Sequence, residues 1–367
     1  MKVIELELSE NKLSGRIPEN LSLLTHLESI SISGNELSGT IPTELGMLSN
    51  LKSLLFNENI LSGLLPNQLF HLTKLEKINV NNNQLSGAIN HNIRKLKHLK
   101  VFFGENNAFS GSIAQQFSEL NALEILRLSN NTFEGSLPQE MGNLINLREL
   151  SLKENGIESD IPVEWQGMEA LEILHLNNNK IHGKIPTSIF DLNKLKDLRL
   201  SSNNLSGTIA PSIGKLSHLE KLSLFDNEIQ GSLPKELGNL EKLETLGLFA
   251  NKISENIPTE LGRLENLEFL LLSLNKLTGS IPVELGNMSN IKVISLWNNN
   301  LSGKVPESFS NLKDLFELII DTNMIKGPIP EKVCELRYNG KGNLHELSAD
   351  SKICKESKDS CCTKWHN

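Results

Sequence analysis

The four cysteines of this chain lie close to its C-terminus, at Cys334, Cys354, Cys361 and Cys362. Such a cluster predicts either two disulfides, for which three connectivities exist, or a zinc site of three cysteines completed by His345 or His366. Because the adjacent Cys361 and Cys362 lack the C-x2–4-C spacing typical of zinc ligands, we favour disulfides over zinc and over free thiols. We expect each of these two to pair with one of the other cysteines, as in oxidising, extracytoplasmic compartments.

The other residue types that do chemistry form no catalytic motif. The nine histidines are scattered, and the sequence has no glycine-rich phosphate loop, no H-E-x-x-H and no nucleophile elbow. A formal charge of −8 argues against nucleic acid as the main partner. No apolar run approaches the roughly 18 residues of a membrane span. We therefore expect no enzyme activity, no cofactor and no metal.

An asparagine that recurs every 24 residues is the strongest pattern in the sequence. It stands at Asn11, Asn35, Asn59, Asn83, Asn107, Asn131, Asn155, Asn179, Asn203, Asn227, Asn251, Asn275, Asn299 and Asn323. A fixed period of this length is the signature of stacked repeats. The repeat overrides the two or three domains that the length alone would predict.

Apolar residues hold fixed places around each asparagine. In the turn of Asn59, Leu54 stands five residues before it, Phe56 three before it and Leu61 two after it. The alternation of apolar and polar residues before the asparagine predicts a short half-buried strand. Stacked turns would align these strands into a parallel sheet with a spacing of about 4.8 Å.

The carboxamide gives a physical reason for the recurring asparagine. It has two donors and one acceptor, so we expect it to bond backbone groups of its own turn and of the next. Glycine follows four residues later, where a tight bend favours a residue without Cβ, except at Ser159 and Glu255. Proline follows seven residues later, as the expected first residue of a short helix, except at Asn90, Ala114 and Ala210.

Together these positions give L-x-x-L-x-L-x-x-N-x-L-S-G-x-I-P, which resembles the plant-type leucine-rich repeat across residues 1–338. The resemblance implies an α/β repeat solenoid. Its right-handed superhelix would have a concave parallel sheet of about 14 strands, one per repeat, and convex short 3-10 helices. The sequence also resembles the ectodomains of receptor-like proteins and kinases of this class.

The ends of the chain differ from its middle. We predict a solenoid over residues 1–330 and, where the period breaks, a cysteine-containing cap over residues 331–367. The cap resembles the C-terminal caps of extracellular leucine-rich repeat proteins. The N-terminus begins directly with a strand, without a secretory leader or a polar cap. We expect the natural chain to begin upstream, with a cytosolic protein that starts at Met1 as the alternative.

Apolar residues replace polar ones at outward positions of turns ten to thirteen. The replacements are Phe225, Phe249, Phe269, Leu271, Leu274, Val293 and Trp297. Most other turns have polar residues in these columns, such as Ser33 and Asn57. An exposed apolar patch usually marks an interaction site, and tryptophan is favoured at binding hot spots. The alternatives are apolar drift without function, or packing against a cap or a second copy.

A second candidate site is basic. Arg127, His175 and Arg199 share the position four residues before the asparagine. They would bind a carboxylate through charge-assisted hydrogen bonds, unless neighbours such as Glu149 and Asp197 neutralise them. Members of the resembled family that bind peptide hormones often carry two arginines on one strand. Here each arginine stands alone on its strand, which weakens the peptide-hormone interpretation.

The sequence also contains a glycine at a core position and several glycosylation triplets. Gly104 occupies a core position beside the outward Phe103, and we interpret it as a local packing change compensated by Phe102. Glycosylation triplets begin at Asn20, Asn130, Asn204, Asn287 and Asn300. The repeat generates such triplets by itself, so they only permit glycosylation.

The sequence thus predicts a non-catalytic recognition module that acts in signalling or defence, outside the cell or at its surface. It would bind a peptide, glycan fragment or protein on the concave face, with a co-receptor as a further candidate partner. Because fold does not establish function, two alternatives stay open. One is a soluble inhibitor of a secreted enzyme, similar to polygalacturonase-inhibiting proteins, and the other is a cytoplasmic interaction scaffold with reduced cysteines.

Overall fold

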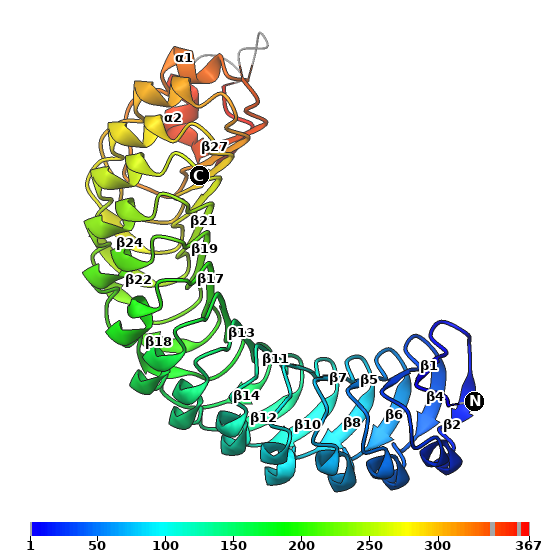
Figure 1. Cartoon of the computed structure of the whole chain (residues 1–367). Helices are drawn as coiled ribbons and strands as arrows, with labels where there is room; N and C mark the ends of the chain where they lie inside the picture. Colours follow the sequence, from blue (N-terminus) through cyan, green and yellow to red (C-terminus); the bar gives the residue numbers. More distant parts are fainter. Residues whose placement is uncertain (1, 338–341, 358–360, 367) are drawn as a thin grey trace. The chain divides into compact units, whose positions relative to one another are not determined.

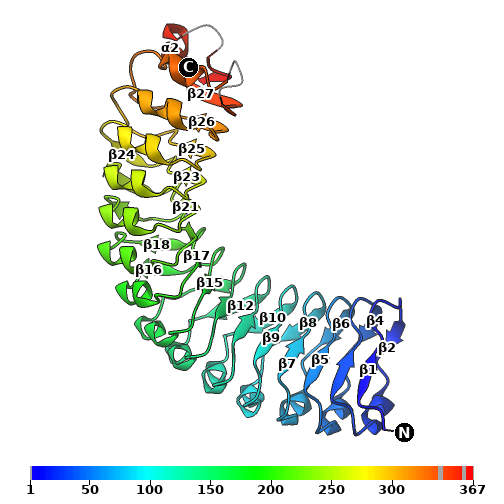
Figure 2. The same cartoon turned by 45° about the horizontal axis from the view of Figure 1, so that its top comes forward.

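The computed structural model describes residues 2–337, 342–357 and 361–366. The chain divides into two units, Met1–Ile181 and His182–Asn367, and each is described by itself. Within each unit, every turn of the repeat adds one strand to a main parallel sheet and one 3-10 helix on the opposite side (Figures 1 and 2). The α/β repeat solenoid predicted from the asparagine period is confirmed.

The first unit contains two parallel sheets and a row of 3-10 helices. Its main sheet consists, in pairing order, of β1 (Glu5–Glu7), β3 (Ser29–Ser31), β5 (Ser53–Leu55), β7 (Lys77–Asn79), β9 (Val101–Phe103), β11 (Ile125–Arg127), β13 (Glu149–Ser151) and β15 (Ile173–His175). The second sheet consists of β2 (Ser14–Arg16), β4 (Glu36–Gly39), β6 (Ile60–Gly63), β8 (Gln84–Gly87), β10 (Ala108–Gly111), β12 (Thr132–Gly135) and β14 (Gly156–Ile157). The helices are η1 (Glu19–Leu23), η2 (Thr43–Met47), η3 (Asn67–His71), η4 (His91–Lys95), η5 (Gln115–Glu119), η6 (Gln139–Asn143) and η7 (Val163–Gly167).

The second unit repeats this plan and ends in the cysteine-containing segment. Its main sheet consists of β17 (Asp197–Arg199), β19 (Lys221–Ser223), β21 (Thr245–Gly247), β23 (Phe269–Leu271), β25 (Val293–Ser295), β26 (Glu317–Ile319), β27 (Glu346–Asp350) and β28 (Lys364–His366). Shorter strands pair as β16 (His182–Lys184) with β18 (Asn204–Ser206), and as β20 (Gln230–Gly231) with β22 (Lys252–Asn256) and β24 (Lys276–Thr278). The helices are η8 (Thr187–Asp191), η9 (Pro211–Lys215), η10 (Lys235–Asn239), η11 (Thr259–Arg263), η12 (Val283–Asn287), η13 (Glu307–Asn311), α1 (Glu331–Cys334) and α2 (Ser351–Glu356).

The predicted columns form the core between the sheets and the helices. Leu54, Phe56 and Leu61 are fully buried, and Leu54 pairs in register with its counterparts Ile30 and Ile78. The second sheet was not predicted, because its residues had been read only as a bend. The cap adds β27 and β28 to the main sheet of the second unit, and the domain boundary at residue 330 stays a prediction.

Two details of the helical segment correct or extend the prediction. Where proline stands seven residues after the asparagine, it lies directly before the helix with an extended backbone, as in Pro42 (φ −63°, ψ 137°), and not at the first helical position. Where Asn90 replaces it, its side chain accepts a hydrogen bond from the Asn92 amide (2.9 Å) and caps the helix. The helices also pack very closely, since a Cβ on Gly142 would lie 2.1 Å from the Glu164 carbonyl oxygen.

Candidate functional site

The recurring asparagines fix the backbone beneath the candidate site. In the second unit, Asn251 Oδ1 accepts a hydrogen bond from the Ile229 amide (3.0 Å), and its Nδ2 donates to the carbonyl oxygens of Leu224, Leu248 and Phe249 at 3.0, 3.2 and 3.3 Å. The carboxamide therefore bonds its own turn and the preceding turn. The prediction of bonds to the following turn is wrong, because the side chain points toward the Ile229 amide and the Leu224 carbonyl oxygen of the preceding turn.

The residue directly before each asparagine has a left-handed backbone, with φ between 52° and 62°. Glycine, asparagine and other polar residues occupy most of these positions. Leu274 is an exception, with φ 54° and a half-buried side chain. A left-handed conformation costs an L-residue roughly 1–2 kcal/mol, and the repeat imposes it at this position in every turn. Leu274 therefore combines an exposed apolar surface with a strained backbone.

Two phenylalanines form the most ordered part of the predicted apolar patch. The rings of Phe225 and Phe249 are stacked, with centroids 4.3 Å apart and planes 9° from parallel. Both side chains are half-buried. Offset stacked rings contribute about 0.5–1.5 kcal/mol beyond the area they bury. The pair thus presents a rigid apolar surface on the sheet side of turns ten and eleven.

The other patch residues follow on the next turns. Leu271 lies in register between Gly247 and Ser295. The Leu274 amide donates to the Trp297 carbonyl oxygen at 2.9 Å, which places these two half-buried side chains on neighbouring turns. The column that contains Phe249 and Trp297 is interrupted by the buried Ser273, whose hydroxyl bonds Ser295 (2.9 Å).

Phe269 and Val293 form a second group, at the start of their strands, where they pair in register. They line an open groove of about 630 Å³ together with Lys292, Asp314, Phe316, Glu317 and Asn343. Phe316 is not among the predicted site residues; it is 45% exposed and stacks on His345 with ring centroids 5.1 Å apart. Its column holds charged residues in other turns, which was an available signal, whereas His345 lies outside the period.

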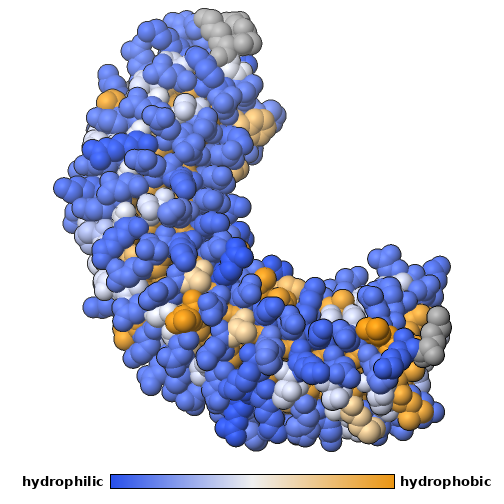
Figure 3. All heavy atoms as spheres, in the orientation of Figure 1, coloured by the Kyte–Doolittle hydropathy of each residue, from blue (hydrophilic) through white to orange (hydrophobic). Residues whose placement is uncertain are grey.

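Polar surface predominates on the face of the second unit that is visible in Figure 3, and apolar side chains gather there in small patches. Isolated apolar residues on a protein surface need no explanation. Two stacked, half-buried rings on consecutive turns, followed by further apolar side chains on the next turns, are a different observation. The patch therefore stays our candidate binding surface.

The basic residues are engaged by acidic neighbours. In the first unit, Arg127 binds Glu149 through two hydrogen bonds of 2.7 and 2.8 Å, and its guanidinium lies 5.0 Å from the ring centroid of Phe103. In the second unit, Arg199 binds Asp197 at 2.9 and 2.8 Å. These hydrogen bonds raise the pKa of both arginines above the ordinary value. A ligand carboxylate would have to displace both protein carboxylates.

His175, the third member of the basic column, lies in β15 of the first unit. The column thus extends over both units, and its role in binding stays a prediction. The interpretation of Gly104 fits its surroundings. A Cβ there would lie 3.0 Å from Phe102 and from Leu128 and 3.3 Å from Phe109, so larger neighbours fill the space.

The cysteines form the predicted number of disulfides. Cys334 is bonded to Cys361 and Cys354 to Cys362, so each adjacent cysteine reaches back along the chain. The zinc alternative is wrong, because all four sulfur atoms are in disulfides. The five asparagines of the glycosylation triplets are exposed, and their modification stays a prediction.

The comparison with known families agrees with the repeat pattern. Residues 105–257 and 206–360 match a family model described as a leucine-rich repeat region, and residues 2–24, 26–48 and 74–96 match one described as a leucine-rich repeat. The chain belongs to the leucine-rich repeat family. No curated protein sequence matches it.

Several solved structures resemble this leucine-rich repeat protein. The plant peptide hormone receptor RGFR1 in complex with RGF2 has a TM-score of 0.81 and 30% identity, over 95% of this chain and 63% of that one. PEPR1 with AtPEP1 has a TM-score of 0.78 and 32% identity, over 92% and 51%. The Arabidopsis receptor kinase HAESA, in complex with the peptide hormone IDA and the co-receptor SERK1, has a TM-score of 0.70 and 30% identity, over 95% and 71%.

These similarities show a plant-type leucine-rich repeat protein that resembles receptor ectodomains. The chain spans 63% and 51% of the length of the first two of these receptors. The receptors point to a ligand-recognition module rather than to a catalytic domain, and together with the disulfides they suggest an extracellular setting. In the described part of the chain, no helix is both long and apolar enough to cross a membrane.

Proposed function

We propose that this leucine-rich repeat protein is a non-catalytic recognition module that works outside the cytosol. It binds an extended peptide, or an extended segment of a protein, across the sheet side of the second unit from β19 to β25. The observation that carries the proposal is the stacked pair Phe225 and Phe249, followed on the next turns by Leu271, Leu274 and Trp297. All five side chains are half-buried on the sheet side of one unit.

The geometry suits a chain-like ligand. Three steps of about 4.8 Å between neighbouring strands span about 14 Å, a distance that about four extended residues cover. Aromatic side chains provide large contact areas with few rotatable bonds, so little entropy is lost when they bind. Because the asparagines fix the backbone at Phe249 and Trp297, these rings are held in place before a ligand arrives.

Related structures support this choice of ligand. HAESA is described in complex with the peptide hormone IDA, and RGFR1 is described as a plant peptide hormone receptor in complex with RGF2. The disulfides Cys334–Cys361 and Cys354–Cys362 favour an oxidising compartment and argue against a cytoplasmic scaffold. A co-receptor remains a further proposed partner, by analogy with HAESA.

The experiment is a selection from a random peptide display library against the whole oxidised chain. Synthetic versions of the selected peptides are then titrated against the double variant Phe249→Ala/Trp297→Ala and against the control Ile145→Ala, which removes an exposed side chain of the first unit that is 57% accessible. Hot-spot truncations cost at least about 2 kcal/mol, so we expect affinity to fall about 30-fold or more in the double variant. The control should bind normally.

Two outcomes would overturn the proposal. In one, the selected peptides bind the double variant as tightly as the unmodified chain. In the other, the selection yields no peptide, while photo-crosslinking groups placed at Phe225 and Leu271 label no peptide of the library. Unchanged melting temperatures of the variants would exclude unfolding as the cause of lost binding.

A further inference from the structure

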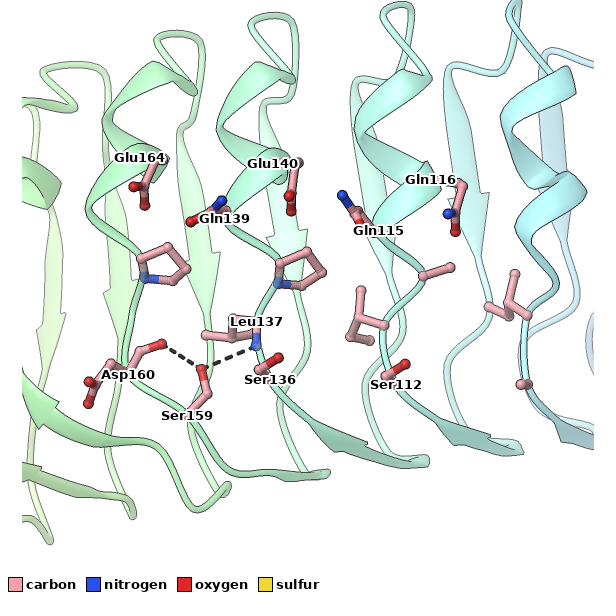
Figure 4. A pocket seen from close by; sticks show the side chains of 16 residues that line it. Ser112, Gln115, Gln116, Ser136, Leu137, Gln139, Glu140, Ser159, Asp160 and Glu164 are labelled. Atoms are coloured by element: carbon pink, nitrogen blue, oxygen red, sulfur yellow. Dashed lines mark hydrogen bonds between the residues drawn. The ribbon is translucent and has the colours of Figure 1, made fainter.

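We propose that the first unit carries, on its flank, a binding groove for a neutral oligosaccharide. A cavity of about 810 Å³ runs between the second sheet and the starts of η5, η6 and η7 (Figure 4). One row of its lining consists of Gln115, Gln116, Gln139, Glu140 and Glu164. The opposite row contains Ser112, Ser136 and Ser159. This site lies on another surface from the peptide site and does not depend on it.

The groove exists because the side chains at one position of the repeat are small in successive turns. Five residues after the asparagine, the early turns carry larger side chains, and those of Arg16, Thr40 and Leu64 lie over the glycine of the following turn. The next three turns have Ala88, Ser112 and Ser136 in this column. A Cβ at Gly135 would still be 3.6 Å from the Ser112 side chain, so the small residues leave the flank open.

Departures from the repeat also gather at this groove. Ala114 replaces the usual proline, and Ser159 replaces the usual glycine, and both line the cavity. The Ser159 hydroxyl accepts a hydrogen bond from the Leu137 amide (3.1 Å) and donates to the Asp160 carbonyl oxygen (2.5 Å), as Figure 4 shows. These two bonds fix the rim of the groove. Neither departure contributes to the sheet side, where the peptide site lies.

The polar groups of the first row are available to a ligand. In the part of the chain that the structure describes, no protein hydrogen bond engages the side chains of Gln115, Gln116, Gln139, Glu140 or Glu164. Amides both donate and accept, whereas ionised carboxylates only accept. A ligand that complements both must carry many groups that donate and accept, as the hydroxyls of a sugar do.

The lining also determines which sugars fit. It contains Glu140 and Glu164 but no lysine, arginine or histidine, so a uronic-acid or sulfated chain would be repelled. It contains no aromatic side chain, and sugar rings therefore gain no stacking contact. The groove should bind neutral oligosaccharides weakly, through hydrogen bonds over several turns.

The test measures binding of neutral hexasaccharides to the whole oxidised chain by saturation-transfer NMR. The probes are cellohexaose, laminarihexaose and maltohexaose, with hexagalacturonate as the anionic comparison. The variant Ser112→Leu/Ser136→Leu fills the groove with the side chain that Leu64 carries in the same column two turns before Ser112. The variant Gln115→Ala/Glu140→Ala removes two polar side chains of the lining. Thr40→Leu is the matched control, because it makes the same kind of change in the same column outside the groove.

We expect at least one neutral probe to bind. Its affinity should fall at least tenfold in both double variants and stay unchanged in Thr40→Leu, and hexagalacturonate should not bind. The proposal is overturned if no neutral probe binds, if binding persists in the filled variant, or if hexagalacturonate binds equally well. Melting temperatures confirm that each variant is folded.

Discussion

The sheet sides of the two units have the same backbone and opposite surfaces. In the first unit, polar side chains bond one another from turn to turn. Ser33 donates to Asn57 (2.7 Å), and Asn81 donates to Glu105 (3.1 Å). In the second unit, the same columns carry the stacked Phe225 and Phe249 and, further on, Trp297. On the first surface several polar side chains bond one another, whereas the second leaves apolar rings in contact with water.

This difference distinguishes the residues that stabilise the repeat from the residues that would contact a ligand. Asn59 in the first unit and Asn251 in the second make the same set of backbone hydrogen bonds. The asparagine bonds therefore do not depend on which side chains occupy the column of Asn57 and Phe249. Selection for binding can alter that column freely, and exposed rings that the fold does not require point to a partner.

The largest expected effect belongs to the second unit alone. Reduction of the disulfides should destabilise it by about 3–4 kcal/mol for Cys334–Cys361, which closes 27 residues, and less for Cys354–Cys362, because longer loops lose more chain entropy. Hydrogen exchange should rise in β26 and β27 and stay unchanged in β1 to β11. Equal increases in both units would contradict the assignment of the stabilisation to the cap.

The asparagines should matter equally in both units. Asn179→Ala removes bonds to the Ile157 amide (3.1 Å) and to the carbonyl oxygens of Leu152 and Leu176 (both 3.0 Å). Because buried partners are left unpaired, we expect a loss of about 1–3 kcal/mol in chemical denaturation. Asn251→Ala should cost a similar amount. The exposed Asn146→Ala serves as control, and an Asn179→Ala loss no greater than the control's would refute the role.

A substitution at Leu274 tests whether this apolar side chain contributes to binding at a cost in the free energy of unfolding. Leu274→Gly should raise the free energy of unfolding by up to about 1 kcal/mol, because glycine adopts the left-handed backbone without strain. The same variant should weaken peptide binding. Ala250→Gly, at the same position one turn earlier (φ 54°), controls for relief of backbone strain without loss of a large side chain. A destabilised Leu274→Gly would show that the leucine packs in the fold instead.

The smallest effect belongs to the charge pairs of the first unit. Hydrogen bonds from Lys52 and Lys100 lower the pKa of Glu28 and Glu76 below the ordinary value of 4.5. Because the pKa is lowered in the folded state, each carboxylate stabilises the fold at a pH above its ordinary pKa. This stabilisation disappears as the pH falls through the folded-state pKa.

Glu28→Gln/Glu76→Gln should therefore flatten the loss of stability in acid, and high salt should mimic part of the change. The exposed Glu169→Gln, outside these pairs, should leave the pH profile intact. An acid profile that is the same in the double variant and the unmodified chain would show that the pairs contribute nothing measurable.

The main sheet, the short helices and the buried core could be predicted because each turn repeats the same sequence pattern. The buried columns, the recurring asparagine and the presence of two disulfides followed from spacing. Which of Cys334 and Cys354 pairs with Cys361 did not, because both lie upstream of the adjacent cysteines. The direction of the asparagine bonds did not, since the carboxamide has partners on either side. Phe316 and His345 were missed because their contact joins a repeat to the cap. The flank groove was missed because it results from small side chains, which give no positive signal in a single sequence.

The constant offsets of the asparagine bonds have a consequence for how such chains change length. Beyond the first turn, the carboxamides contact residues 22 and 27 positions earlier, as Asn59 does with Leu37 and Ile32. Duplication or deletion of a whole 24-residue segment preserves all of these offsets, whereas any other change in length shifts an entire column. Unequal recombination between neighbouring repeats therefore yields folded descendants. A chain with a second copy of residues 36–59 should still unfold cooperatively in a calorimeter.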